Sequence, residues 1–141
     1  MNAQPVDEWI KKAEDNYISA LTLARRRSRP VPDVVCNQCQ QCAEKYLKAL
    51  LVRHQVDFPK IHDLVQLEEL AVRVEPDVRL IHSTLATLNP YGIDIRYPGL
   101  EATVEEAHEA RTKRARSAYE ALKAVRNIRK FARSKLGLGT Q

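Results

Sequence analysis

Apolar side chains recur along this chain at spacings of three and four residues, the period of helices that bury one face. The first stripe consists of Trp9, Ile10, Ala13, Tyr17, Ala20, Leu21 and Ala24, within residues 7–27. The same period predicts further helices at residues 33–54, 62–72, 77–87 and 103–134. No stretch alternates apolar and polar residues as a half-buried strand does. The pattern therefore predicts an all-α fold.

Aspartates and prolines lie at the predicted starts of the helices. Asp7 and Asp33 each precede a stripe, where an aspartate side chain caps free backbone N–H groups. Residues 88–102 contain two prolines and two glycines without a helical period, so we predict an ordered loop there. Together these signals predict one domain, residues 1–141, built as an up-and-down antiparallel bundle of four to five helices.

Composition agrees with this architecture. Of the 141 residues, 44% are hydrophobic, 29% are charged and only 4 are glycine, which suits one helical domain and not a disordered or fibrous chain. No 18-residue apolar run is present, so we expect no membrane span, and the N-terminal residues lack the apolar core of a signal peptide. We therefore expect a cytoplasmic protein with reduced thiols, since its 3 cysteines cannot all pair within one chain.

The net charge of +5 is concentrated near the C-terminus. Residues 111–135 carry ten basic side chains against one acid, Glu120, whereas an acidic block lies upstream at Glu101, Glu105, Glu106 and Glu109. A helix dipole is stabilised by this order of charges, with acids at the start and basic residues at the end. One interpretation is therefore that these charges form the solvent-exposed face of one helix. The other is a surface for an anionic partner such as RNA or an acidic protein face. Few aromatic residues lie among these basic side chains, which weakens the interpretation as an RNA-binding surface.

Three cysteines occupy every third position of the segment CNQCQQC, residues 36–42. On a helix, positions three apart differ by about 60°, so the sulfurs spread over roughly 120° of one face. A zinc site needs a fourth ligand, and an iron–sulfur cluster is usually bound from a loop. We therefore predict core packing and no metal. A reactive Cys36, with a thiol pKa lowered at the first helical turn, is the alternative.

Four segments together resemble the HEPN family. They are QQCAEKYLKALL at residues 40–51, PKIHDL at 59–64, LN at 88–89 and RYP at 96–98. Each segment is short, but their order and spacing span nearly the whole chain. The resemblance implies a bundle of four to five helices that pairs as a homodimer, in agreement with the periodicity. No cofactor is implied.

Many HEPN proteins are ribonucleases or toxins with an arginine, four to six spacer residues and a histidine. Here no arginine lies at that spacing before His54, His62, His82 or His108. Other members accompany minimal nucleotidyltransferases in toxin–antitoxin-like systems, and the family has been proposed to bind nucleotides. The resemblance thus implies a non-catalytic protein that binds a nucleotide or such a companion. The alternatives are a ribonuclease with a divergent site built from Arg96, His62 and Lys48, and nonspecific RNA binding by the last helix.

The candidate binding residues begin with the irregular segment. Arg96 has the paired donors that clasp a phosphate or carboxylate, and Tyr97 beside it can stack on a base or close the dimer. The competing interpretation is that both only stabilise the loop. Asn89 is assigned either to the site or to the same structural role.

Two further pairs complete the candidate site. His62 and Asp63 open a predicted helix, so they either line a cleft with Arg96 or cap the helix and orient the preceding loop. Lys45 and Lys48 fall on the polar side of their helix, where they either bind an anion or serve as a solvated face. Glu44 and Lys48 form an i,i+4 pair worth about 0.2–0.5 kcal/mol on an exposed helix.

Overall fold

The computed structural model describes residues 5–92 and 104–139, and the regular elements in these ranges are all helical. The α-helices are α1 (Val6–Ala24), α2 (Pro32–Arg53), α3 (Leu64–Ala71), α4 (His82–Leu88) and α5 (Val104–Lys135). Two 3-10 helices, η1 (Pro76–Ile81) and η2 (Asn89–Gly92), come immediately before and after α4. The predicted all-α class is confirmed.

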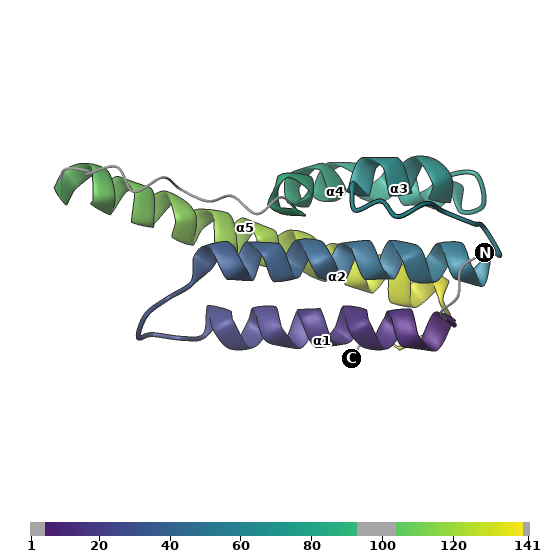
Figure 1. Ribbon diagram of the computed structural model, residues 1–141, viewed down its shortest axis with the longest axis horizontal. Helices are drawn as coiled ribbons and strands as arrows, with labels where there is room; N and C mark the ends of the chain where they lie inside the picture. Colours follow the sequence, from purple (N-terminus) through teal and green to yellow (C-terminus); the bar gives the residue numbers. More distant parts are fainter. Residues whose placement is uncertain (1–4, 93–103, 140–141) are drawn as a thin grey trace.

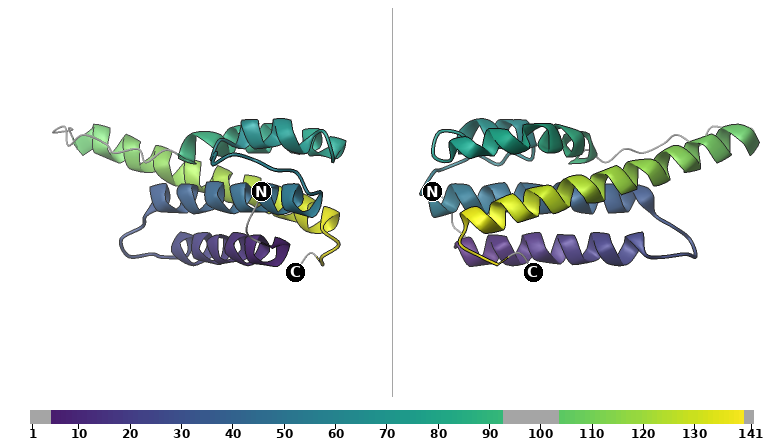
Figure 2. Two further views of the ribbon diagram at one scale, coloured as in Figure 1. Left: turned by 45° about the vertical axis from the view of Figure 1, so that its right-hand side comes forward. Right: turned by 180° about the vertical axis from the view of Figure 1, so that it is seen from behind.

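The helices form an up-and-down bundle around α2, as predicted (Figure 1). α1 runs antiparallel to α2 on one side, and α3 and α4 cover its other side. α5 crosses α2 obliquely on a third side, which the view from behind shows most clearly (Figure 2). The first half of α5 projects beyond the start of α2, at the end of the molecule where the loop from α1 to α2 lies.

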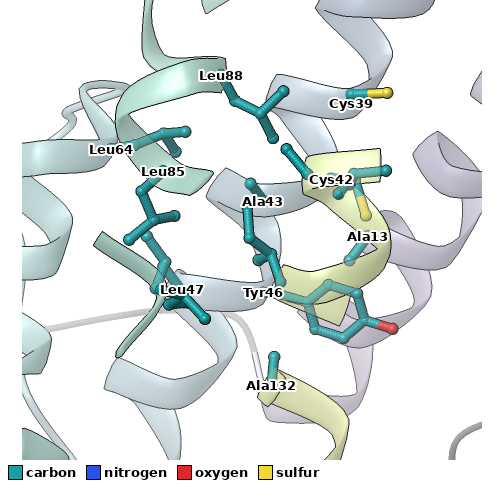
Figure 3. Packing of buried hydrophobic residues seen from close by; sticks show 14 of the residues in the cluster. Ala13, Cys39, Cys42, Ala43, Tyr46, Leu47, Leu64, Leu85, Leu88 and Ala132 are labelled. Carbon is teal, nitrogen blue, oxygen red and sulfur yellow. The ribbon is translucent and has the colours of Figure 1, made fainter. Parts of the chain in front are cut away.

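The central position of α2 follows from its composition. Of its 22 residues, 13 are buried, far more than a helix with a single buried face would hide. In Figure 3, the inward-facing side chains of α2 meet Ala13 of α1, Leu64 of α3, Leu85 of α4 and Ala132 of α5. Alanine at these contacts lets α1 and α5 approach closely, whereas leucines fill the wider space beneath α3 and α4.

Two of the predicted helix caps are wrong. α1 begins at Val6 with Pro5 as its N-cap, and α2 begins at Pro32 after Val31, with no side-chain cap bond at either end. Proline is favoured at a helix start because its φ is preset and it lacks the N–H that would be left free. Asp7 and Asp33 instead lie within the first turns, where their negative charge still favours the helix dipole.

Other boundaries differ from the predictions by a few residues. The helix predicted over 62–72 is Leu64–Ala71, and the one predicted over 77–87 is η1 followed by α4. In the predicted loop at 88–102, Leu88 ends α4, residues 89–92 form η2, and residues 93–102 lie outside the described part of the chain. Within residues 5–92 and 104–139, no helix combines the length and the apolar character that a membrane span requires.

After α2, the chain turns back along this helix (Figure 1). Gln55 adopts a left-handed backbone with φ of 59°, and Val56 N–H donates to the Leu51 carbonyl at 2.9 Å. This is the Schellman arrangement, which satisfies the last carbonyls of a helix and turns the chain sharply. The following residues return along α2, so that Phe58 packs edge-on against Trp9 of α1 with their ring centroids 6.1 Å apart.

Candidate functional site

A buried carboxylate lies at the centre of the residues that the sequence singled out. Glu44, on α2, is 1% exposed, and Lys48 Nζ lies 3.1 Å from its Oε2. Lys45 Nζ approaches the same oxygen at 3.4 Å, and His62 Nδ1 lies 3.1 Å from both carboxylate oxygens. We call Glu44, Lys45, Lys48 and His62 the Glu44 cluster.

The cluster holds more positive than negative charge. Burial alone would raise the pKa of the Glu44 carboxyl, but Lys45, His62 and Lys48 together bring that pKa below its ordinary value. Glu44 is therefore ionised at neutral pH, and two lysines face one carboxylate. The cluster reaches solvent at the His62 side chain, which is 69% exposed, and in part at the Lys45 ammonium group.

Lys48 does not belong to a solvated face, which corrects the sequence interpretation. The residue is only 5% exposed, and its Nζ lies 5.4 Å from the centroid of the Trp9 ring and 5.6 Å from that of Phe58. Both rings therefore offer cation–π contacts to the ammonium group. The period of α2 alone could not reveal this, because Trp9 comes from α1 and Phe58 from the loop after α2.

Lys45 is also less solvated than predicted. Its ammonium group donates to Gln41 Oε1 at 3.0 Å, in addition to its contact with Glu44. Gln41 in turn donates to Gln40, which donates to the His62 carbonyl at 3.0 Å. This chain of hydrogen bonds fixes the positions of the Lys45 ammonium and of the segment that carries His62.

His62 and Asp63 do not act as a pair. Asp63 is the N-cap of α3, and its Oδ1 accepts from the Val65 and Gln66 N–H groups at 2.9 and 3.0 Å. His62 instead contacts Glu44. Asn89 accepts from the Leu64 N–H at 2.8 Å and donates to Asp63 at 3.3 Å. Asp63 and Asn89 thus secure the start of α3.

The remaining predicted residues, Arg96 and Tyr97, lie outside the described residues. The described chain stops just before them at Gly92, which lies directly against Gln40. A Cβ at Gly92 would come within 2.8 Å of Gln40 Nε2, so this position favours glycine. Asn37 reinforces the same contact by donating to the Tyr91 carbonyl at 2.9 Å.

A second buried carboxylate, Glu68, escaped the sequence analysis. It is fully buried on α3 and bound by Arg79 Nη1 at 2.7 Å and His82 Nδ1 at 2.6 Å, both from the segment that follows. The signal was present in the sequence, since Glu68 lies next to Leu67 and one turn after Leu64 on a short apolar helix. A charged residue so close to a buried stripe usually has a partner.

Part of the basic last helix faces inward. Arg129 forms two hydrogen bonds to Glu14 of α1, at 2.8 and 2.7 Å, and its guanidinium lies 4.5 Å from the Tyr17 ring centroid. Tyr46 of α2 also donates to Glu14. At the end of α5, Lys135 pairs with Asp77 at 2.7 Å. These charges hold helices together, which reduces the surface that the last helix offers to RNA.

The three cysteines pack in the core, as predicted. Cys36, Cys39 and Cys42 are all buried and form no disulfide. The alternative of an activated Cys36 is contradicted, because burial and nearby Asp33 raise the pKa of its thiol to about 11. Burial likewise raises the pKa of Cys39 to about 12.

These pKa values predict slow thiol chemistry in the folded state. At pH 8 we expect the native protein to react with Ellman's reagent at least 100-fold more slowly than the same protein unfolded in guanidinium, because the thiolate is the nucleophile and a thiol near pKa 11 is rarely ionised. The release of thionitrobenzoate measures both rates. Reaction of one thiol at the unfolded rate in native protein would contradict the core assignment.

The family assignment agrees with this geometry. The HEPN domain model matches residues 6–135. The fold is similar to the crystal structure of an archaeal HEPN homologue, with a TM-score of 0.65 and 23% sequence identity over 94% of this chain and 98% of that one. The comparison with curated proteins found no match. The chain belongs to the HEPN domain family.

Proposed function

We propose that this HEPN protein is non-catalytic and binds a nucleotide through the solvent-facing side of the Glu44 cluster. The observation that carries the proposal is the excess of positive charge around one buried carboxylate, with His62 exposed beside it. A phosphate would meet Lys45 and His62, whose positions the Glu44 and Gln41 contacts already fix. Preorganised donors of this kind lose little entropy when an anion binds.

Arg96 belongs to this proposal as a further phosphate ligand, beside Lys45 and His62. It follows Gly92 by four residues, which extended chain can stretch to at most about 14 Å, and Gly92 lies against Gln40, one turn of α2 before Glu44. A guanidinium offers two parallel donors to a phosphate, which neither lysine can do. Tyr97 would stack on the base.

We also propose that the protein acts as a homodimer beside a minimal nucleotidyltransferase, in a two-component toxin–antitoxin-like system. Membership of the HEPN family supports this role. Nucleotide binding and a nucleotidyltransferase companion fit together, because both proteins would then handle the same nucleotide.

Calorimetric titration with ATP at low salt tests the nucleotide site. We expect binding that weakens at least tenfold in Lys45→Met and in Arg96→Ala, since each removes a charge from the phosphate. Lys113→Met, which removes an exposed charge on α5, is the matched control and should bind as the wild type does. No ATP binding, or an equal loss in the control, would contradict the site.

One observation favours a second candidate, the ribonuclease. Arg79 and His82 lie together on Glu68, so an arginine and a histidine are neighbours in space although they lack the family's sequence spacing. The divergent site first considered is weaker, because Lys48 is buried under two rings. Cleavage of cellular RNA by the wild type but not by His82→Gln would favour this candidate over a non-catalytic role.

A further inference from the structure

An apolar groove opens at the end of the bundle opposite Phe58 and Lys48. It has a volume of about 670 Å³ and lies between the end of α1, the start of α2 and the middle of α5. Its lining is mainly aliphatic, with Leu23, Pro30, Val31, Val35, Ala118 and Leu122 among its residues. Figures 1 and 2 show this end of the molecule, where α5 extends past the loop from α1 to α2.

Two large apolar side chains at the groove remain exposed. Val34, at the start of α2, is 44% exposed, and Tyr119, on α5, is 66% exposed. Both line the same groove, so their exposure is contiguous with its aliphatic wall. A continuous apolar surface of this kind marks an interaction site more often than scattered exposed residues do.

Basic side chains border the groove. The loop between α1 and α2 carries four exposed arginines next to the lining residues: Arg25, Arg26, Arg27 and Arg29. On α5, Arg114 belongs to the lining, and Lys113 and Arg116 lie next to lining residues in the sequence. Among the described residues on or directly beside the lining in the sequence, the acids are Asp33, whose Oδ2 lies 4.0 Å from Arg114 Nε, and Glu120. The border is therefore strongly positive around an apolar floor.

We propose that this groove binds an amphipathic helix of a partner protein, with an apolar stripe flanked by acidic residues. The stripe would cover Val34 and Tyr119, and the acids would face the arginines of the loop. This is the helix-in-groove mode of recognition, with the charges adding speed and orientation to the encounter. The site is separate from the Glu44 cluster, since Val34 and Lys45 are about 16 Å apart along α2.

The charge and shape of the groove favour this occupant over two others. RNA binding relies on aromatic platforms beside the basic residues, and Tyr119 is the one aromatic residue of the lining. A second copy placed groove to groove would bring the two basic borders together, which like-charge repulsion opposes. An acidic helix satisfies both the apolar floor and its border.

The test uses a fluorescein-labelled 18-residue peptide of glutamate and alanine with leucines at positions i, i+3, i+4 and i+7. We expect binding by fluorescence anisotropy, weakened at least tenfold by Val34→Glu and by Tyr119→Glu, with folding checked by circular dichroism. Leu80→Glu, which alters an exposed leucine on η1 away from the groove, is the matched control and should bind normally. A peptide of equal composition without an apolar stripe should bind at least tenfold more weakly.

Three results would overturn the proposal. Equal binding of both peptides would mean that charge alone attracts them. Competition by a 12-residue uridine oligonucleotide, itself dependent on Val34 and Tyr119, would assign the groove to RNA. A dimer by light scattering that Tyr119→Glu, but not Leu80→Glu, converts to a monomer would assign it to a second copy. None depends on ATP binding at the Glu44 cluster, so the two proposals can fail separately.

Discussion

Glu44→Gln is expected to lower the free energy of unfolding by about 3 kcal/mol at pH 7, the lower part of the range for breaking a buried ion pair. The amide keeps the shape of the side chain but leaves Lys48 charged beneath Trp9 and Phe58 without a counter-ion. Removing the Glu44 charge costs less free energy at Lys45 and His62, because water reaches both side chains. Denaturation by urea with circular dichroism measures the difference.

The loss should depend on pH with a defined sign. The pKa of Glu44 is lower in the folded protein than in the unfolded chain, so ionised Glu44 stabilises the fold above the unfolded value of about 4.3. This contribution disappears as the pH falls through the folded pKa and Glu44 becomes protonated. The difference in stability between the wild type and Glu44→Gln should therefore shrink steadily as the pH falls below the unfolded pKa of about 4.3. Curves that remain parallel down to pH 3 would contradict the assignment.

Two variants make the test specific. Glu69→Gln removes an exposed carboxylate 3.4 Å from Arg79 and should cost at most about 0.5 kcal/mol, as exposed pairs do. Adding Lys48→Met to Glu44→Gln should restore most of the lost stability, because an apolar side chain suits the space between the two rings. Failure of the second change to restore stability would mean that Lys48 is not the group left unpaired.

The sequence predicted the helices well because each has a strong local signal. The three-and-four period identifies α1, α2 and α5, and the helix predicted from residue 77 begins one residue earlier, at Pro76 of η1. Caps were harder to predict, since proline and aspartate compete for the first positions of a helix. Pro5 is the N-cap of α1 and Pro32 begins α2, whereas Asp63, with no proline in α3, does act as a cap.

The candidate site was predicted only in part, for a physical reason. His62, Lys45 and Lys48 were chosen from the sequence, and they do gather around one carboxylate. Which side chains are buried could not be predicted, because the four other α-helices cover α2 and burial depends on all of them. The ion pairs of Glu14 and Glu68 join residues 115 and 11 positions apart, which no local pattern reports.

Leu47→Ala is expected to cost about 2–5 kcal/mol, the range for truncating a fully buried leucine. Leu47 is 1% exposed on α2, and Figure 3 shows Leu85 of α4 beside it. Since α3 and α4 are short, such contacts supply most of what keeps them on α2. Leu80→Ala, at 79% exposed, is the control and should change stability by about 0.5 kcal/mol at most.

Leu47→Ala should destabilise α3 and α4 more than α1, α2 and α5. α1, α2 and α5 are long and joined by the Glu14 ion pairs, whereas α3 and α4 rest on leucines above α2. In Leu47→Ala, hydrogen exchange should therefore rise more in α3 and α4 than in α1. A uniform rise would show that the bundle opens as one unit. Because Asp63 and Asn89 secure the start of α3 next to His62, loss of this layer would also release one side of the Glu44 cluster.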